Sequence, residues 1–197
     1  MAVTAVTGID ALSHALESYV TARRNPLSQM FAREAWRLLE GNFEAVLRRP
    51  DDLAARSGMQ LGAHLAGAAI ENAMLGAAHA CANPLTAHYG QTHGVAVGVL
   101  LPHVVRFNAA AAGVLYGDLV HDVGLLNGDE HAAAEVLARH LAALLERAGL
   151  PRALSACGVS RDILPLLAEE AAQQWTGKFN PRPVSEPELL ALYEAAW

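Results

Sequence analysis

Apolar residues recur at intervals of three and four along most of the chain, which is the period of helices with one buried face. The clearest case lies near the start, where Ile9, Leu12, Leu16 and Tyr19 share one side of a helix expected from about residue 8 to 22. Runs of β-branched residues, which are typical of strands, are few. The pattern predicts an all-α protein built as a multi-helix bundle.

Proline, glycine and asparagine separate the periodic segments and mark where further helices begin and end. The helices expected after the first cover residues 26–49, 52–72, 112–125, 129–148, 160–174 and 186–196. The last four are amphipathic and are expected to form outer layers. Ser185 and Glu188 have the spacing of a capping box, which indicates where the final helix begins.

Two stretches differ from the simple amphipathic pattern. The helix at 52–72 is rich in glycine and alanine, which let neighbouring backbones approach closely, so it is expected to be the buried helix of the bundle. Between residues 75 and 108, Pro84, Gly90 and Gly94 interrupt the pattern and predict short helices joined by tight connections. Polar side chains suited to chemistry concentrate in this second stretch.

Composition is that of a single soluble domain. The chain has 197 residues, enough for one sizeable core and too few for the two full domains of a typical dehydrogenase. Hydrophobic residues make up 53%, while aromatics make up 6%, which favours close-packed helices over a β-sandwich. No repeat or linker divides residues 1–197. The net charge of -6 and the scattered arginines argue against a nucleic-acid partner, which requires a clustered basic face.

Cysteine usage and the start of the chain indicate the compartment. Cys81 and Cys157 are far apart and lack paired spacing, so a reducing environment is expected. Residues 1–6 have no basic segment and no clear apolar core, so they do not resemble a secretion signal. The apolar stretch at 94–105 is shorter than the roughly 20 residues that a membrane span requires. A cytoplasmic protein without a membrane partner is expected.

Four side chains are candidate ligands of a metal ion. Asp10 and His14 are four residues apart and project from one face of a helix, while His79 and His93 lie on two later elements. Several imidazoles with one carboxylate suit Fe(II) or Zn(II) better than calcium or magnesium. By its spacing alone the set is weak, because Asp and His four residues apart also form ordinary exposed ion pairs.

Three segments resemble, in the same order, the motifs of the C-terminal helical domain of iron-containing (group III) alcohol dehydrogenases. They are residues 8–19 (GIDALSHALESY), the block from His79 to Gly94 with residues 100–108, and residues 176–182 (TGKFNPR). The resemblance covers essentially the whole chain. It implies the fold of these enzymes, an α-domain similar to that of dehydroquinate synthase.

The resemblance also implies a function. In that family the metal is held by the residues that match Asp10, His14, His79 and His93 here. The reaction is reversible hydride transfer between the carbon of a small alcohol, or its aldehyde or ketone, and the nicotinamide of NAD(P). The metal acts as a Lewis acid on the substrate oxygen. The resemblance implies Fe(II), with Zn(II) as the alternative.

The sequence departs from the family in two respects. The nucleotide-binding domain that precedes the first motif has no counterpart here, so NAD(P) would need a missing or partner domain, and residues 1–197 alone are expected to be inactive. The family often has a proton-relay histidine where this chain has Asn83, which cannot exchange a proton near pH 7. Either His88 replaces it, or water carries the proton, or the reaction is slow. Ile70 and Trp175 match positions that line the substrate pocket.

Other functions remain to be weighed against the enzyme. The main alternative is a non-catalytic helical metal-binding or assembly module derived from the same family, and a homo-oligomer is a further partner to test. A ferritin-like di-metal bundle would need Glu-x-x-His repeats on paired helices, and a zincin protease would need His-Glu-x-x-His. Neither pattern occurs in the sequence.

Overall fold

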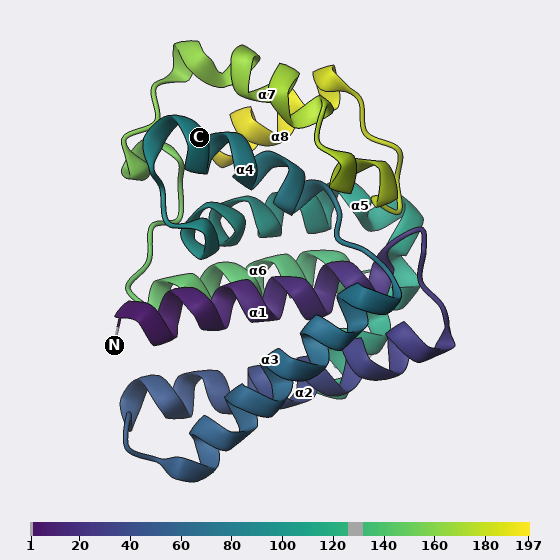
Figure 1. Ribbon diagram of the computed structural model, residues 1–197, viewed down its shortest axis with the longest axis vertical. Coiled ribbons are helices and arrows are strands. Elements are labelled where there is room, and N and C mark those ends of the chain that lie inside the picture. Colours follow the sequence, from purple (N-terminus) through teal and green to yellow (C-terminus); the bar gives the residue numbers. More distant parts are fainter. Residues whose placement is uncertain (1, 126–131) are drawn as a thin grey trace.

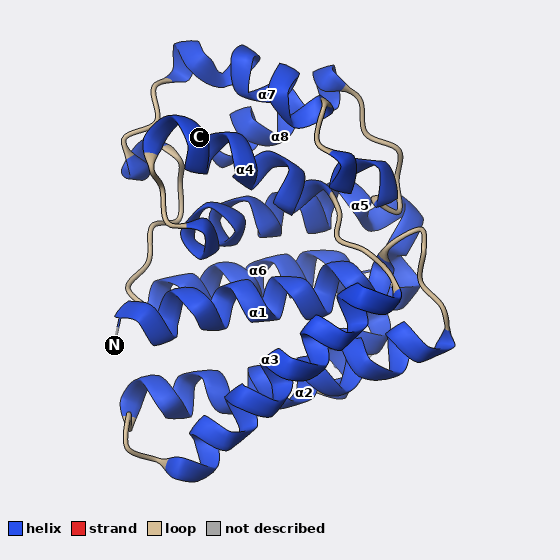
Figure 2. Ribbon diagram, in the orientation of Figure 1, coloured by secondary structure: helices blue, strands red, loops and turns tan. Residues whose placement is uncertain are grey.

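The computed structural model describes residues 2–125 and 132–197, and within these ranges every regular element is a helix (Figure 2). The eight α-helices there are α1 (Ala2–Val20), α2 (Pro26–Arg48), α3 (Leu53–Asn72), α4 (Ala77–Tyr89), α5 (His93–Asp122), α6 (Ala133–Arg147), α7 (Leu164–Ala172) and α8 (Glu186–Ala196). Short 3-10 helices include η2 (Ser155–Cys157), η3 (Arg161–Ile163) and η4 (Trp175–Phe179). The all-α prediction is confirmed.

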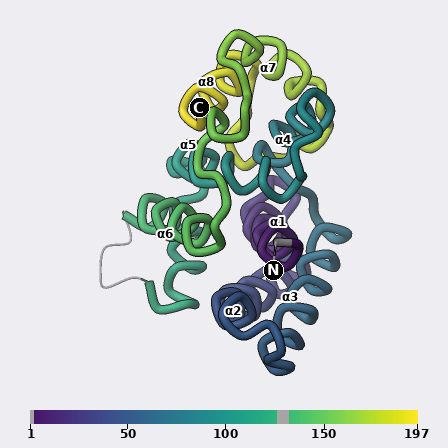
Figure 3. The backbone as a smooth tube through the Cα atoms, turned by 90° about the vertical axis from the view of Figure 1, so that its left-hand side faces the viewer, coloured from purple at the N-terminus to yellow at the C-terminus, as the bar shows by residue number. Residues whose placement is uncertain are grey.

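Helix α1 runs through the middle of the molecule (Figure 1). It packs against the α2–α3 pair on one side and against α5 on the other, and the view in Figure 3 shows it enclosed by the other helices. Its apolar face is fully buried at Leu12, Ala15 and Leu16. Helices α7 and α8 pair with each other above α4 and α5. The first helix is therefore the element around which the core is organised.

The prediction that α1 begins near residue 8 is wrong, because the helix begins at Ala2. Gly8 lies inside the helix, where a side chain would come within 2.6 Å of the ring of Phe43 on α2. The glycine allows α1 and α2 to pack closely, and it does not mark the start of α1.

The prediction that 52–72 is the buried helix is also wrong. Helix α3 lies at the edge of the bundle and exposes Leu53 by 78% and Leu61 by 51%. Its small residues do allow a close approach, since a side chain at Gly62 would come within 2.7 Å of Leu39 on α2. Composition indicated close packing correctly, but the contact lies on one side of an outer helix.

The break predicted between residues 108 and 112 does not occur, because α5 is one continuous helix of 30 residues that includes Pro102. A proline inside a helix removes one backbone hydrogen bond. Here α5 packs against both α1 and α6, and a side chain at Gly98 would lie 2.7 Å from Ile9 and 2.8 Å from Leu145. We infer that packing along both sides offsets the lost hydrogen bond.

Other boundaries follow the sequence more closely. Gly90 ends α4 in the left-handed conformation (φ 58°), so the tight connection predicted before α5 is confirmed. Pro84 and Gly94 were also expected to interrupt the helices, but they lie inside α4 and α5. The last helix begins at Glu186 as expected, and the Ser185 backbone N–H donates to the Glu188 carboxylate at 2.7 Å. Helix α7 starts at Leu164, later than expected. Helix α6 starts at Ala133, and residues 129–131 of its predicted span lie outside the described residues.

Helix α5 is long and apolar enough to cross a membrane, with a mean hydropathy of 1.5 over its most apolar window. However, 67% of that window is buried against other helices of the bundle. Its apolar residues are therefore accounted for by burial in the core of the bundle.

A charge cluster joins the end of α5 to α2. Asp122, whose side chain is 4% exposed, accepts hydrogen bonds at 2.9 Å from both Arg33 and Arg37. Burial opposes ionisation of Asp122, but the two guanidinium groups hold its pKa below the usual value. The folded state therefore favours the charged carboxylate.

We expect Asp122→Asn to lower the free energy of unfolding by about 1–2 kcal/mol at pH 7, because Arg33 and Arg37 lose their shared carboxylate and keep only the longer contacts with Asp118 at 3.8 Å and Glu34 at 3.3 Å. The folded-state pKa of Asp122 is depressed, so its stabilising effect is complete well above pH ~3.9 and is lost as pH falls through the folded pKa. Urea unfolding between pH 7 and pH 3 measures this. If the difference in free energy of unfolding between variant and parent stayed constant down to pH 3, the prediction would be contradicted.

Candidate metal centre

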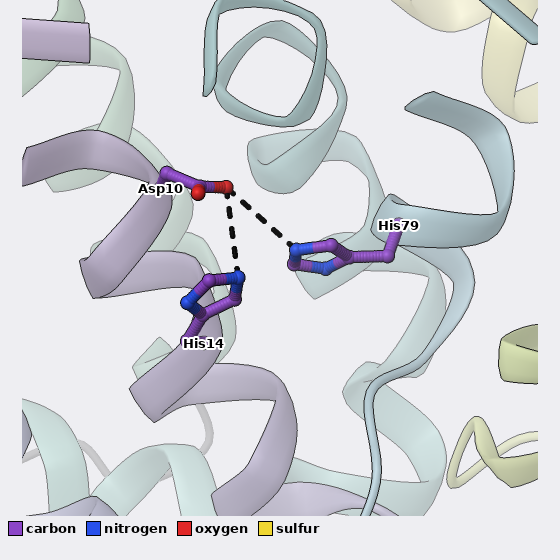
Figure 4. Close-up of side chains that lie close together, drawn as sticks. All are labelled: Asp10, His14 and His79. Atoms are coloured by element: carbon purple, nitrogen blue, oxygen red, sulfur yellow. Dashed lines mark ion pairs between the residues drawn. The ribbon is translucent and has the colours of Figure 1, made fainter. Parts of the chain in front are cut away.

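Three helices bring the candidate ligands together. Asp10 and His14 lie one turn apart on α1, His79 lies in the first turn of α4, and His93 is the first residue of α5. Figure 4 shows the side chains of Asp10, His14 and His79 pointing toward one another across the space between α1 and α4. The arrangement needs the tight connection between α4 and α5, which keeps the two later histidines near each other.

The three imidazoles converge on a single carboxylate oxygen. Oδ1 of Asp10 lies 3.7 Å from Nε2 of His14, 3.7 Å from Nε2 of His79 and 3.8 Å from Nε2 of His93. One ligand atom from each of Asp10, His14 and His79 lies within 4.8 Å of the others, and His93 falls outside this tighter group. The side chain of His93 is also 36% exposed, against 5% for His79, so it forms the open side of the cluster.

The cluster fits a metal ion. Oδ1 of Asp10 and Nε2 of His79 are buried without a hydrogen-bond partner within the described part of the chain. Their separation of 3.7 Å is too long for a hydrogen bond. Two ligand atoms that share a tetrahedral ion at about 2.1 Å are about 3.4 Å apart, close to the separations here. An ion between them would satisfy both unpartnered atoms, which are costly to bury otherwise.

The ionisation of the cluster also suits a cation. Burial lowers the pKa of His14 to about 4 and lowers that of His93, so both rings are neutral at pH 7. Burial opposes ionisation of Asp10, but the nearby imidazole of His79, together with those of His14 and His93, holds its pKa below the usual value. Burial lowers the pKa of His79, yet Asp10 and Glu17 raise it to about 9, so at pH 7 a cation would have to displace a proton from this ring in order to bind.

Glu17 is a buried part of the centre to which the sequence analysis gave no role. Its side chain is 3% exposed, and its Oε2 lies 2.6 Å from Nδ1 of His79, on the side of the ring away from Asp10. It also accepts hydrogen bonds from the backbone N–H groups of Gly76 at 3.1 Å and Ala78 at 2.8 Å. One signal was present in the sequence, since Glu17 lies on the same face of the first helix as Asp10 and His14.

The third motif has a structural role beside the centre. Asn180 and Asn108 form a buried pair of reciprocal side-chain hydrogen bonds at 3.0 and 2.7 Å. Oδ1 of Asn180 also accepts from the backbone N–H of Ala77 at 3.2 Å, at the start of α4. Arg182 places its guanidinium 3.9 Å from the ring centre of Phe107 on α5. The motif therefore holds the beginning of the helix that carries His79.

The two residues considered for proton relay lie on different sides of α4. Asn83 is one turn after His79, and its amide donates to Oε1 of Gln174 at 2.9 Å. His88 lies about two and a half turns after His79, which puts it on the opposite side of the helix. There its Nε2 is 2.9 Å from both carboxylate oxygens of Glu170 on α7. The position of His88 gives no support to a relay role.

The two residues expected to line a substrate pocket lie on separate elements. Ile70 is partly buried near the end of α3. Trp175 begins η4, is 56% exposed, and sets its ring against Phe179 in an edge-on contact with centroids 6.0 Å apart. A role of either residue in binding substrate stays a prediction.

Comparisons with known proteins agree with the geometry. A family model described as the Fe-containing alcohol dehydrogenase family, C-terminal, matches residues 4–197. The 1,3-propanediol dehydrogenase of Klebsiella pneumoniae is 36% identical over 198 residues, and the lactaldehyde reductase of Escherichia coli (strain K12) is 34% identical over 202 residues. Both alignments cover 100% of this chain and 51% of the relative.

Solved structures give the same result. A 1,3-propanediol oxidoreductase superposes with a TM-score of 0.94 at 35% identity, and an alcohol dehydrogenase from Oenococcus oeni with 0.94 at 30% identity. Each match covers 98% of this chain and 51% of the other. The chain thus spans about half the length of the proteins that it matches.

Proposed function

The chain belongs to the iron-containing alcohol dehydrogenase family, and from this premise we propose that residues 1–197 form the metal- and substrate-binding part of such an enzyme. The observation that carries the proposal is the convergence of three imidazole Nε2 atoms on Oδ1 of Asp10. When bound, a divalent cation supplies a Lewis acid that polarises an alcohol or carbonyl oxygen for hydride transfer to or from NAD(P).

Four residues of this chain would hold and orient that cation. Asp10, His14, His79 and His93 are the proposed ligands, and His79, whose side chain is 5% exposed, forms the most enclosed side of the cluster. The donor set accepts both Fe(II) and Zn(II), and the family favours Fe(II). The half-exposed side at His93 leaves room for a substrate oxygen to approach.

We propose a small alcohol, or the corresponding aldehyde or ketone, as the substrate. Ile70 and Trp175 are the proposed apolar contacts. Asn83 takes the relay position, and its amide hydrogen-bonds Gln174 but cannot release a proton near pH 7. The hydroxyl proton would then leave through water. Because His88 is paired with Glu170 on the far side of α4, it is the weaker candidate for this step.

The nicotinamide nucleotide requires a unit other than residues 1–197. The curated relatives are about twice as long as the part that this chain matches. We propose that the nucleotide-binding unit is either another part of the same polypeptide or a separate chain.

The thiols of Cys81 and Cys157 are both free, in keeping with the reducing cytoplasmic compartment that we expect.

We expect purified residues 1–197, loaded anaerobically with Fe(II), to show no NAD-linked oxidation of 1,3-propanediol. Joining them to the half of the Klebsiella pneumoniae 1,3-propanediol dehydrogenase that this chain does not match should produce measurable NADH, because the fusion supplies the missing nucleotide site. Absorbance at the NADH band measures this, and a His14→Ala fusion is the matched control.

Robust turnover by residues 1–197 alone would contradict the need for a second unit. A fusion that binds both Fe(II) and NADH but gives no turnover would instead favour the alternative, a non-catalytic metal-binding or assembly module.

A further inference from the structure

Glu17 is a charged group in the core, and its surroundings account for that. An unpaired carboxylate is costly to bury, so a buried one must have charged or hydrogen-bonding partners. Glu17 has three donors, namely Nδ1 of His79 at 2.6 Å and the backbone N–H groups of Ala78 at 2.8 Å and Gly76 at 3.1 Å. All three donors belong to one short segment of the chain.

The contact with His79 determines which ring nitrogen can bind a metal. A neutral imidazole carries its hydrogen on one nitrogen only. When Nδ1–H donates to Glu17, the lone pair is left on Nε2, and Nε2 is the atom that lies 3.7 Å from Oδ1 of Asp10. A carboxylate behind a ligating histidine fixes the tautomer and the ring orientation and makes the ligand more basic.

The contacts with the backbone hold the helix that carries His79. The first N–H groups of a helix have no partner within the helix, and Gly76, at the N-cap of α4, has no side chain to supply one. Glu17 takes this role from a neighbouring helix, and its negative charge suits the positive end of the helix dipole. A side chain at position 76 would come within 2.9 Å of Oε1 of Glu17, so the glycine leaves the carboxylate room to reach the backbone.

We infer that Glu17 is a positioning residue of the metal centre, which fixes the tautomer of His79 and the first turn of α4 with one carboxylate. The inference rests on the proposed function, because it concerns the same metal site. It adds a residue outside the ligand set, so that the central helix α1 supplies two ligands and also orients a third on α4.

Glu17→Gln tests the inference without changing the size of the side chain. A carboxylate presents an accepting oxygen to both sides, whereas an amide presents one oxygen and one NH2 group. In the variant, the NH2 group must face either the N–H of Ala78 or the side of His79 and Gly76, so at least one of these hydrogen bonds is lost. We expect the affinity for Co(II), titrated into metal-free protein, to fall by about 10- to 100-fold.

The visible absorption of bound Co(II) gives a second readout, because it reports the geometry of the ligands and does not depend on turnover. We expect it to change in Glu17→Gln. Asn180→Ala is the matched control, since Asn180 also caps α4, through Ala77, but makes no hydrogen bond to His79 among the described residues. Asn180→Ala should lower the unfolding midpoint while keeping the Co(II) spectrum and, within a few fold, the affinity.

The outcomes separate the inference from the proposed function. If the parent protein binds no Co(II), the proposed metal site fails. If the parent protein binds Co(II) and Glu17→Gln binds it with the same affinity and spectrum, the positioning role of Glu17 is overturned. If both variants lose affinity equally at an equal loss of stability, Glu17 acts only through the fold, and the inference is again overturned.

Discussion

Replacing His79 or Asp10 by alanine is expected to reduce bound Fe(II) from about one ion per chain to near zero after dialysis, because metal affinity depends on the number of correctly placed ligands. These two residues supply the buried, unpartnered atoms of the cluster. Each variant keeps three of the four proposed ligands, and two of these, His14 and His93, are partly exposed, with 26% and 36% of their side chains accessible. Such an incomplete set would hold the ion weakly against water. Elemental analysis of the dialysed protein measures the loss.

The two variants differ in how they affect the fold, and this makes the test robust. His79→Ala leaves the buried carboxylate of Glu17 without its closest partner, so this variant should also be less stable. Asp10→Ala removes a side chain that is 25% exposed and leaves the Glu17 contacts in place. His64→Ala, at an exposed position of α3, is the control and should keep the full metal content. Unchanged metal content in both ligand variants would refute the site.

Much of the fold was predictable because helix-forming patterns act locally. The spacing of apolar residues placed most helices. The short-range signals at Gly90 and Ser185 correctly marked the end of α4 and the beginning of α8. Pro84 misled, since its local effect on a helix was outweighed by the packing of α4 on α5 and α7. The small residues of α3 misled in another way, because close packing on one side does not require burial on all sides.

The candidate site was less predictable from local patterns than the helices were. Spacing placed Asp10 and His14 on one helical face, but only the resemblance to a family connected them with His79 and His93. Glu17 and Asn180 could not be assigned from local patterns, because their partners lie far away in the sequence. A buried glutamate on a helix looks, in the sequence, like one that faces solvent. Its role appears only when another helix brings unpartnered N–H groups to it.

Gly94→Ala is expected to lower the free energy of unfolding by about 3 kcal/mol, through overpacking where α5 meets α1. A side chain at position 94 would clash with the backbone oxygen of Val6. A backbone atom within a helix cannot move aside alone, so the two helices must separate. Because Gly94 directly follows His93, we also expect weaker metal binding. Urea unfolding of the metal-free protein and Co(II) titration measure the two effects.

Gly113→Ala on the same helix separates this steric effect from the general effect of replacing a glycine. Position 113 has nothing within 4 Å of an added side chain, so alanine there should stabilise the protein by about 0.5–1 kcal/mol through its higher helix propensity. The two substitutions are therefore expected to act in opposite directions. If Gly94→Ala also stabilised the protein, α5 could not approach α1 as closely as the structure shows. The position of His93 beside Asp10, which depends on that approach, would then be in doubt as well.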